Sequence, residues 1–263
     1  MHPLGEKYLR KSSLPTLFCP GCGDGTILNA MIRVVDKMGG TSNFLFVSGI
    51  GCSGWIPVFI NADCIHTLHG RAIAVATGLK MAQPGKHVIV FTGDGDCLGI
   101  GGNHFIHAAR RNLDVTVVMV NNYIYGMTGG QVAPTTPEKV VTKTTPYGNI
   151  EPPFDACGLA KAAGATFIAR HTAALPRMLT NDLAKAIQHK GFSFVEIMTQ
   201  CPTQAGRIIY GTGEPSFLFK ELKSRAVVAK NAELKANQFR IGVLHDDSSR
   251  PAYAPIVRTE EIA

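Results

Sequence analysis

The fold of this chain is decided by the stretch His87-Val-Ile-Val-Phe-Thr-Gly-Asp-Gly-Asp96. It begins as an unbroken apolar run, which is typical of a strand buried on both faces. It ends in two glycines and two carboxylates, where the strand passes into a loop. Further along, a second apolar run at residues 115–120 ends at Asn121-Asn122. Both polar motifs therefore fall at the ends of predicted strands.

Three more runs have the same character, at residues 44–48, 166–169 and 192–197. Between the runs, apolar residues recur at helical spacing over residues 25–38, 70–81, 103–111 and 173–189. Strands that alternate with helices predict an α/β fold with a doubly wound, mostly parallel sheet. Ligands of such sheets bind at the carboxyl ends of the strands, which is where Asp94 and Asn122 lie.

The remaining segments break this rhythm. Residues 126–153 carry five prolines and six threonines without periodicity, which is typical of a long functional loop. We expect one domain over residues 1–205, with an irregular N-terminal segment, and a C-terminal tail over residues 206–263 that packs on this domain or on a partner. Within the tail, residues 216–238 have the pattern of an exposed helix, and residues 246–263 that of an extended segment.

The composition limits the class of protein. Charged residues make up only 17% of the 263 residues, which indicates that a partner subunit covers part of the surface. The net charge is +7, but the basic residues are scattered and form no nucleic-acid motif, so we expect no nucleic-acid partner. We find no signal peptide and no apolar run of the roughly 20 residues that span a membrane. With seven cysteines, these features predict a cytoplasmic protein whose thiols bind metal.

Asp94 and Asn122 are candidate ligands of a magnesium ion that holds a diphosphate. Magnesium takes oxygen ligands in octahedral geometry, and a carboxylate, an amide, a backbone carbonyl, water and phosphate oxygens can supply them. Gly93 and Gly95 let the backbone approach the phosphates closely. The alternative is two ordinary strand-end turns, because Gly, Asp and Asn are common turn residues.

Four cysteines lie among glycine, proline and serine residues, where tight turns can aim sulfur at a common centre. They are Cys19, Cys22, Cys52 and Cys201. A cubane 4Fe–4S cluster takes four thiolates. Zinc and a redox-active Cys-x-x-Cys pair are alternatives, although structural zinc sites usually bring two close pairs. The other three cysteines have apolar or helical contexts typical of small buried residues, namely Cys64, Cys97 and Cys157. Cys97 also lies in the predicted diphosphate loop, so its role stays open.

The Gly93-Asp-Gly-Asp96 and Asn121-Asn122 pair resembles the thiamine-diphosphate-binding fold family. In that family the aspartate and the second asparagine bind the metal, which implies Asp94 and Asn122 in this sequence. The backbone ligand of the family falls two residues later, on the carbonyl of Ile124.

More of the chain, over residues 10–205, resembles the β subunits of 2-oxoacid:ferredoxin oxidoreductases, and the 2-oxoglutarate type most closely. The motifs that carry this resemblance are Phe18-Cys-Pro-Gly-Cys-Gly23, Ser48-Gly-Ile-Gly-Cys-Ser-Gly54, Thr67-Leu-His-Gly-Arg-Ala72, Gly93-Asp-Gly-Asp96, Gly101-Gly-Asn-His104 and Asn121-Asn-Tyr-Ile-Tyr-Gly-Met-Thr-Gly-Gly-Gln131. The resemblance implies oxidative decarboxylation of a 2-oxo acid with coenzyme A to acyl-CoA and CO₂, or the reverse carboxylation. It implies thiamine diphosphate, Mg²⁺ and one 4Fe–4S cluster as cofactors, with ferredoxin as the electron acceptor.

The resemblance also explains a missing residue. Thiamine enzymes activate the aminopyrimidine ring with a glutamate, but no glutamate lies between residues 7 and 137. In the resembled family this glutamate comes from the α subunit, so its absence agrees with an αβ or (αβ)₂ heteromer. Ferredoxins are acidic, which suits the basic charge of this chain.

The site residues that the resemblance implies come from several motifs. His69, Arg71 and Met127 are implied at the cofactor and the substrate, as catalytic residues. The implied cofactor-binding residues are Gly49, Ile50, Gly51, Cys52, Ser53, His69, Gly93, Asp94, Gly95, Asp96, Asn122, Gly126, Met127 and Thr128. For His69 and Arg71 the alternative is a pair of surface polar residues at a helix start.

Two residues bear on the identity of the 2-oxo acid. Met127 is apolar where pyruvate-type relatives carry asparagine, which favours a larger acid such as 2-oxoglutarate. Trp55 stands where many relatives carry a basic residue, which weakens the assignment to a dicarboxylate. Pyruvate and branched-chain 2-oxo acids therefore stay open as substrates.

Two other functions also stay open. A non-redox thiamine-diphosphate decarboxylase or synthase would keep the site of Asp94 and Asn122 and use its cysteines structurally. A zinc-stabilised binding protein with a decayed thiamine fold would bind no thiamine diphosphate, and the intact Asp94 and Asn122 argue against it.

Overall fold

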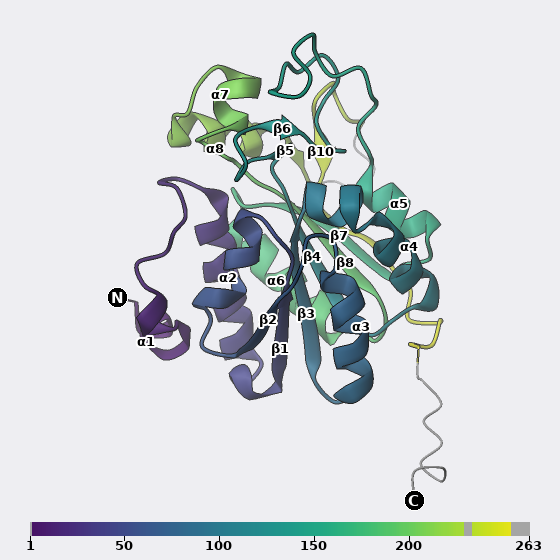
Figure 1. Ribbon diagram of the computed structural model, residues 1–263. Coiled ribbons are helices and arrows are strands. Elements are labelled where there is room, and N and C mark those ends of the chain that lie inside the picture. Colours follow the sequence, from purple (N-terminus) through teal and green to yellow (C-terminus); the bar gives the residue numbers. More distant parts are fainter. Residues whose placement is uncertain (1, 229–232, 254–263) are drawn as a thin grey trace, which may run out of the picture.

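The computed structural model describes residues 2–228 and 233–253 and is built on a seven-stranded sheet (Figure 1). The strand order is β11-β7-β8-β4-β3-β1-β2, and every neighbouring pair is parallel except β11 with β7. The strands are β1 (Phe44–Ser48), β2 (Asp63–His66), β3 (His87–Gly93), β4 (Thr116–Asn121), β7 (Phe167–Thr172), β8 (Ser193–Met198) and β11 (Gly242–Asp246). The predicted α/β fold with a mostly parallel sheet is confirmed.

The central strands form where apolar and β-branched residues run without interruption. β4 is buried along its whole length, and so is its neighbour β8. Such runs need cover on both faces of the sheet, and helices provide it (Figure 1). The five strands expected from the sequence are all present, with ends that move by a few residues.

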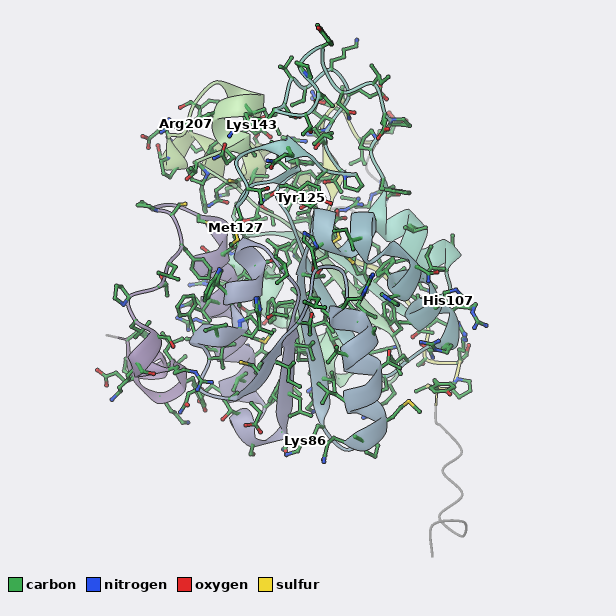
Figure 2. The ribbon with its side chains drawn as sticks, in the orientation of Figure 1. Lys86, His107, Tyr125, Met127, Lys143 and Arg207 are labelled. Carbon is green, nitrogen blue, oxygen red and sulfur yellow. The ribbon has the colours of Figure 1, made fainter. Side chains whose placement is uncertain are left out.

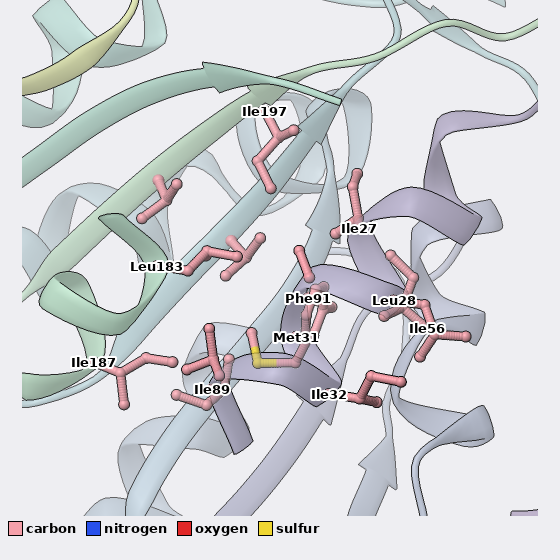
Figure 3. Packing of buried hydrophobic residues seen from close by; sticks show 14 of the residues in the cluster. Ile27, Leu28, Met31, Ile32, Ile56, Ile89, Phe91, Leu183, Ile187 and Ile197 are labelled. Atoms are coloured by element: carbon pink, nitrogen blue, oxygen red, sulfur yellow. The ribbon is translucent and has the colours of Figure 1, made fainter. Parts of the chain in front are cut away.

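Helices pack on both faces of the sheet. α2 (Gly23–Lys37) and α6 (Pro176–Gln188) contribute to the core on one face. The core of the other face takes residues from α3 (Ala72–Ala82), α4 (Gly102–Arg111) and α5 (Ala156–Ala162). In Figure 3, Met31 of α2 and Leu183 of α6 pack over Phe91 of the sheet. In the described part of the chain, no helix is both long and apolar enough to cross a membrane.

The helix expected over residues 216–238 is shorter than predicted. α8 spans Pro215–Arg225, and the chain continues as β9 (Ala226–Val227), which pairs with β10 (Phe239–Arg240). Leu218 and Leu222 of α8 are buried. Leu222 packs in a small separate core with Phe239, and this tertiary packing sets where the helix lies.

Parts of the segments expected to be irregular are ordered. β11 joins the main sheet as its antiparallel edge strand, and residues 254–263 of the expected extended segment lie outside the described residues. α1 (Pro3–Tyr8) lies in the N-terminal segment, and α7 (Ala205–Tyr210) begins at residue 205. The loop at residues 126–153 is irregular except for β6 (Gln131–Val132), which pairs with β5 (Ile124–Tyr125). The division of the chain after residue 205 stays a prediction.

The sheet topology positions the site. The chain passes from β1 to β2 on one side and then to β3 on the other, so the strand order reverses between β1 and β3. Loops that leave the carboxyl ends of strands at such a reversal enclose a crevice where ligands bind. Here these loops carry residues 49–53 and 93–96.

Candidate active site

A cavity of about 80 Å³ lies at this crevice. Its lining comes from the loops after β1, β3 and β4 and from the turn before α3. Figure 2 shows Tyr125 and Met127 above the sheet in this region. The predicted residues that line it are Ile50, Gly51, Cys52, Ser53, His69, Gly93, Asp94, Gly95, Asp96, Asn122, Ile124, Gly126, Met127 and Thr128. Lining residues that the sequence did not indicate are Asp24, Val120 and Tyr125.

Asp96 holds three segments of this lining together. Its buried carboxylate accepts hydrogen bonds from Ile50 N at 3.3 Å, Gly70 N at 2.7 Å and Thr92 Oγ1 at 2.5 Å. His69 Nδ1 lies 2.6 Å from the same carboxylate. Asp96 therefore fixes the loops after β1 and before α3 and orients the imidazole of His69.

Two of the residues predicted to contact thiamine diphosphate or the substrate, Gly49 and Arg71, are not among those that line the cavity. Gly49 packs behind it, because a Cβ at this position would lie 1.8 Å from the Asp96 carboxylate. Arg71 is exposed at the start of α3, and its NH1 lies 3.4 Å from His104 Nε2. The roles assigned to Gly49 and Arg71 stay predictions.

Asp94 and Asn122 reach the same cavity from the ends of neighbouring strands. Asp94 is 2% exposed, and Thr135 Oγ1 donates a hydrogen bond to its carboxylate. Burial raises the pKa of Asp94 to about 7. Asn122 Oδ1 accepts a hydrogen bond from Ile124 N at 3.1 Å, which turns the loop so that Ile124 also lines the cavity. A carboxylate, an amide and a carbonyl are oxygen donors of the type that Mg²⁺ prefers.

One further feature of the cavity fits a bound ligand, and a second explains why position 95 is a glycine. Ser53 Oγ is buried and has no hydrogen-bond partner in the described part of the chain, and native proteins rarely leave such a group unsatisfied. Tyr125 packs its ring on Gly95, where a Cβ would lie 2.4 Å from the ring, and its hydroxyl donates to Gly95 O at 2.9 Å. A side chain at position 95 would therefore displace Tyr125, and the role of Gly95 in cofactor binding stays a prediction.

A second cavity, of about 230 Å³, adjoins the first. The two cavities share four lining residues, Asp24, Cys52, Asn122 and Met127. All four predicted cysteine ligands line the second cavity, namely Cys19, Cys22, Cys52 and Cys201. Burial raises the pKa of the Cys52 thiol to about 12, and it also raises the pKa values of Cys22 and Cys201.

The other three cysteines lie elsewhere in the fold. Cys97 is buried in the π-helical turn Gly95–Ile100, Cys157 of α5 donates to Glu196 at 3.3 Å, and Cys64 belongs to edge strand β2. Among residues 2–228 and 233–253, no group of three or more His, Cys, Asp or Glu side chains is close enough together to hold a metal ion. The four lining thiols therefore share a cavity without forming a ready-made site for a single ion.

Segments that are distant in sequence build the cysteine cavity. Gln200 Nε2 donates to Gly21 O at 3.1 Å, which joins the Cys19–Cys22 turn to the segment after β8. Gly21 has φ +76, and a Cβ there would lie 2.3 Å from Pro215 at the start of α8. Trp55 lines the cavity and stacks on His66 with ring centroids 6.2 Å apart.

Asp24 lies between the two cavities. It is the second residue of α2, it is 3% exposed, and burial raises its pKa to about 6. The nearby thiol of Cys22, the N-cap residue of the helix, opposes this rise in pKa. No sequence signal marked Asp24, because an aspartate in the first turn of a helix is ordinarily a favourable partner of the helix dipole.

Comparison with known proteins identifies the family. Residues 49–197 match the family model for the C-terminal TPP binding domain of thiamine pyrophosphate enzymes. The chain is 49% identical over 234 residues to 2-oxoglutarate synthase subunit KorB of Methanocaldococcus jannaschii, across 89% of this chain and 86% of that one. The chain belongs to the KorB family of 2-oxoacid oxidoreductase subunits. The KorB subunit of Archaeoglobus fulgidus is 53% identical over 216 residues, across 82% and 79% of the two chains.

The fold of this family member is also that of a solved enzyme. The structure of 2-oxoglutarate:ferredoxin oxidoreductase from Magnetococcus marinus, with 2-oxoglutarate, coenzyme A and succinyl-CoA bound, matches with a TM-score of 0.83 and 33% identity. The match covers 94% of this chain and 86% of that chain. The predicted thiamine-diphosphate-binding fold and the predicted oxidoreductase class are confirmed. Both the KorB protein of Methanocaldococcus jannaschii and the KorB protein of Mycobacterium tuberculosis are named as subunits.

Proposed function

We propose that this β subunit takes part in the conversion of 2-oxoglutarate and coenzyme A to succinyl-CoA and CO₂, or in the reverse carboxylation, with ferredoxin as the electron partner. The observation that carries this proposal is the adjacency of two cavities. The cavity of Asp94 and the cavity of the four cysteines share the lining residues Cys52, Asn122 and Met127. An electron acceptor in the second cavity would thus lie beside the reacting atoms in the first.

The residues of the first cavity suit thiamine diphosphate, which supplies an electron sink for the decarboxylation of 2-oxo acids. Asp94, Asn122 and the carbonyl of Ile124 would hold Mg²⁺ against the diphosphate. Ser53 Oγ, which lacks a partner in the described chain, is free to bind the cofactor. His69 is held by Asp96 toward the same space.

The partner subunit would complete this cofactor site. The cavity of about 80 Å³ is far smaller than the roughly 300–1,000 Å³ of typical ligand pockets, so this chain encloses only part of a cofactor. No glutamate lies between residues 7 and 137, and Glu138 is exposed and is not a lining residue. An α subunit that supplies the activating glutamate, in an αβ or (αβ)₂ assembly, meets both needs.

The second cavity suits a 4Fe–4S cluster. Four thiols line about 230 Å³ of space, several times the roughly 30 Å³ that one water molecule occupies, so the cavity is large for a single zinc ion. Burial disfavours thiolates at Cys22, Cys52 and Cys201, so cluster binding must displace protons from these thiols. The net charge of +7 favours docking of an acidic electron carrier such as ferredoxin.

The choice of 2-oxoglutarate rests on the relatives and on Met127. KorB relatives are named for 2-oxoglutarate, and Met127 lines both cavities with half of its side chain exposed. An apolar residue at this position can pack on a longer substrate chain. Pyruvate and branched-chain 2-oxo acids are the alternatives that the assay must include.

The test is anaerobic co-purification with the partner subunit, followed by iron, thiamine diphosphate and absorbance measurements. We expect a broad thiolate-to-iron absorbance band and 2-oxo-acid-dependent reduction of ferredoxin that requires coenzyme A. Decarboxylation without an electron acceptor and without iron would instead identify a non-redox thiamine enzyme with structural cysteines. Zinc in place of iron would overturn the cluster assignment.

A further inference from the structure

We propose that Arg225, the last residue of α8, is a positioning residue that holds Tyr123 and thereby fixes the loop with the magnesium ligands Asn122 and Ile124. This inference rests on the proposed function, because it assumes that the loop binds Mg²⁺ and thiamine diphosphate. It gives the segment after residue 205 a role in cofactor binding, although no residue of that segment lines the cofactor cavity.

The backbone of Tyr123 requires support. Its φ is +69°, in the left-handed region that bulky side chains rarely adopt. This conformation lets Asn121 Oδ1 accept a hydrogen bond from Tyr123 N at 3.0 Å and Asn122 Oδ1 accept one from Ile124 N at 3.1 Å. A strained residue persists only where its surroundings over-determine it, and such residues cluster at ligand sites.

Arg225 supplies that support from three directions. Its NH2 donates to Tyr123 Oη at 3.3 Å, its NH1 donates to Tyr210 Oη at 2.5 Å, and its Nε donates to Asn237 O at 2.6 Å. The guanidinium carbon also lies 5.8 Å from the centroid of the Tyr123 ring and 5.7 Å from that of Phe239. A planar guanidinium can make these contacts at once, whereas the compact ammonium of lysine cannot.

The contacts connect separate elements to one loop. Tyr210 ends α7, Phe239 begins β10, and Tyr123 follows directly after a magnesium ligand at the end of β4. Tyr123 also packs against the small core that includes Leu222 and Phe239. The side chain of Tyr123 therefore points into the C-terminal elements, while its neighbours Asn122 and Ile124 line the cofactor cavity. Loss of Arg225 would therefore remove the contacts that hold the loop at residues 122–124 on the side facing away from the cofactor cavity.

The alternative is that Arg225 only stabilises the end of α8. To separate the two, Arg225→Leu and Arg225→Lys are compared with Lys223→Leu, an exposed residue in the last turn of the same helix. Each variant is prepared as the complete complex with the partner subunit. Calorimetry measures the Kd for thiamine diphosphate at fixed Mg²⁺, and hydrogen exchange measures the protection of backbone amides at residues 121–125 and in α2.

We expect Arg225→Leu to raise the Kd by roughly tenfold or more, the range found when residues that orient metal ligands are changed. Amides at residues 121–125 should exchange faster, while those of α2 keep their protection. Arg225→Lys, which serves if Arg225→Leu does not assemble, should also weaken binding, and Lys223→Leu should not. A wild-type Kd in the Arg225 variants, or faster exchange in α2 as well, would overturn this inference alone. A wild-type complex that binds no thiamine diphosphate would overturn the proposed function too.

Discussion

The carboxyl edge of the sheet and the region around β7 and β8 bury carboxylates in opposite ways. Near β7, the 3% exposed Glu196 accepts a hydrogen bond from Arg170 Nε at 2.6 Å. At the carboxyl edge, Asp94 and Asp24 are just as deeply buried, but neither belongs to a salt bridge within the described residues. Burial raises the pKa values of these two residues to about 7 and about 6.

This difference separates a buried carboxylate that the fold pairs with a cation from buried carboxylates that are candidates for a functional site. A buried carboxylate with a cationic partner has its charge compensated within the chain, and loss of the partner is strongly destabilising. A buried carboxylate without a cation is costly, and it is retained where a bound group supplies the missing charge. Changes at Asp94 and at Arg170, the partner of Glu196, test this contrast directly.

The largest effect is expected at Asp94. Asp94→Ala should abolish binding of thiamine diphosphate with Mg²⁺, because a methyl group cannot hold the cation against the diphosphate charge. Calorimetry on the assembled complex measures this, with Asp63→Ala on exposed strand β2 as the matched control. Asp94→Ala removes the hydrogen bond from Thr135 but also a buried carboxylate without a cationic partner, so the thermal midpoint of the ligand-free complex should change little. Unchanged affinity would remove Asp94 from the site.

The cysteines provide the next test. Serine substitution at Cys19, Cys22, Cys52 or Cys201 should lose iron and the charge-transfer band near roughly 400 nm expected of thiolate-bound clusters. The same change at Cys64, Cys97 or Cys157, which lie outside the cysteine cavity, should keep both. If Cys157→Ser lost the iron while Cys201→Ser retained it, the set of ligands would be wrong.

On the paired side of the comparison, Arg170→Met should reduce stability while leaving the site intact. Glu196 would be left as an uncompensated buried charge, and breaking such a pair costs about 3–5 kcal/mol of unfolding free energy. A denaturant titration of the complex measures the loss, and Arg177→Met, at an exposed position on α6, is the control. Folded Arg170→Met should still bind thiamine diphosphate. If Arg170→Met lost cofactor binding but kept its full unfolding free energy, Glu196 would belong to the cofactor site and the two regions would not differ in role.

Met127, which lines both cavities, tests which residue selects the substrate. One buried methylene is worth about 0.8 kcal/mol, so discrimination by this side chain should be modest, on the order of tenfold. Met127→Asn should shift the ratio of kcat/KM for 2-oxoglutarate and pyruvate towards pyruvate without loss of the cofactor. An unchanged ratio would show that Met127 is only a packing residue. The substrate pocket would then be formed by the partner subunit and by residues near Trp55.

The smallest effect is expected at Asp182. Its hydrogen bond with His171, at 2.8 Å, holds the pKa of Asp182 below its usual value despite partial burial, and Lys185 adds to this. A lowered carboxyl pKa contributes stability above the unfolded-state pKa of about 3.9, and this stability is lost as the pH falls through the folded-state pKa. Asp182→Asn should therefore lower the thermal midpoint at pH 7 and progressively less towards pH 3. A constant difference across this range would mean that the charge of Asp182 does not matter.

Much of the fold and of the lining of the candidate site was predictable, because both depend on local pattern. The apolar runs at residues 44–48 and 87–92 match β1 and β3, and the glycine-rich ends of those strands line the cavity. Edge strands were missed, because β2 is largely exposed and β11 lies in a segment with no continuous apolar run. The end of α8 at Arg225 was missed because packing against Phe239, rather than helical periodicity, decides it.

The sequence by itself determined which residue types meet at the carboxyl edge of the sheet. Parallel strands place their carboxyl ends together, so Asp94 and Asn122 had to converge. Only the tertiary structure decided that Asp24 separates the two cavities and that Arg225 supports the loop of Tyr123 from the far side. Whether a charged side chain is buried and paired depends on contacts between segments that are distant in sequence. Local sequence patterns do not predict such contacts.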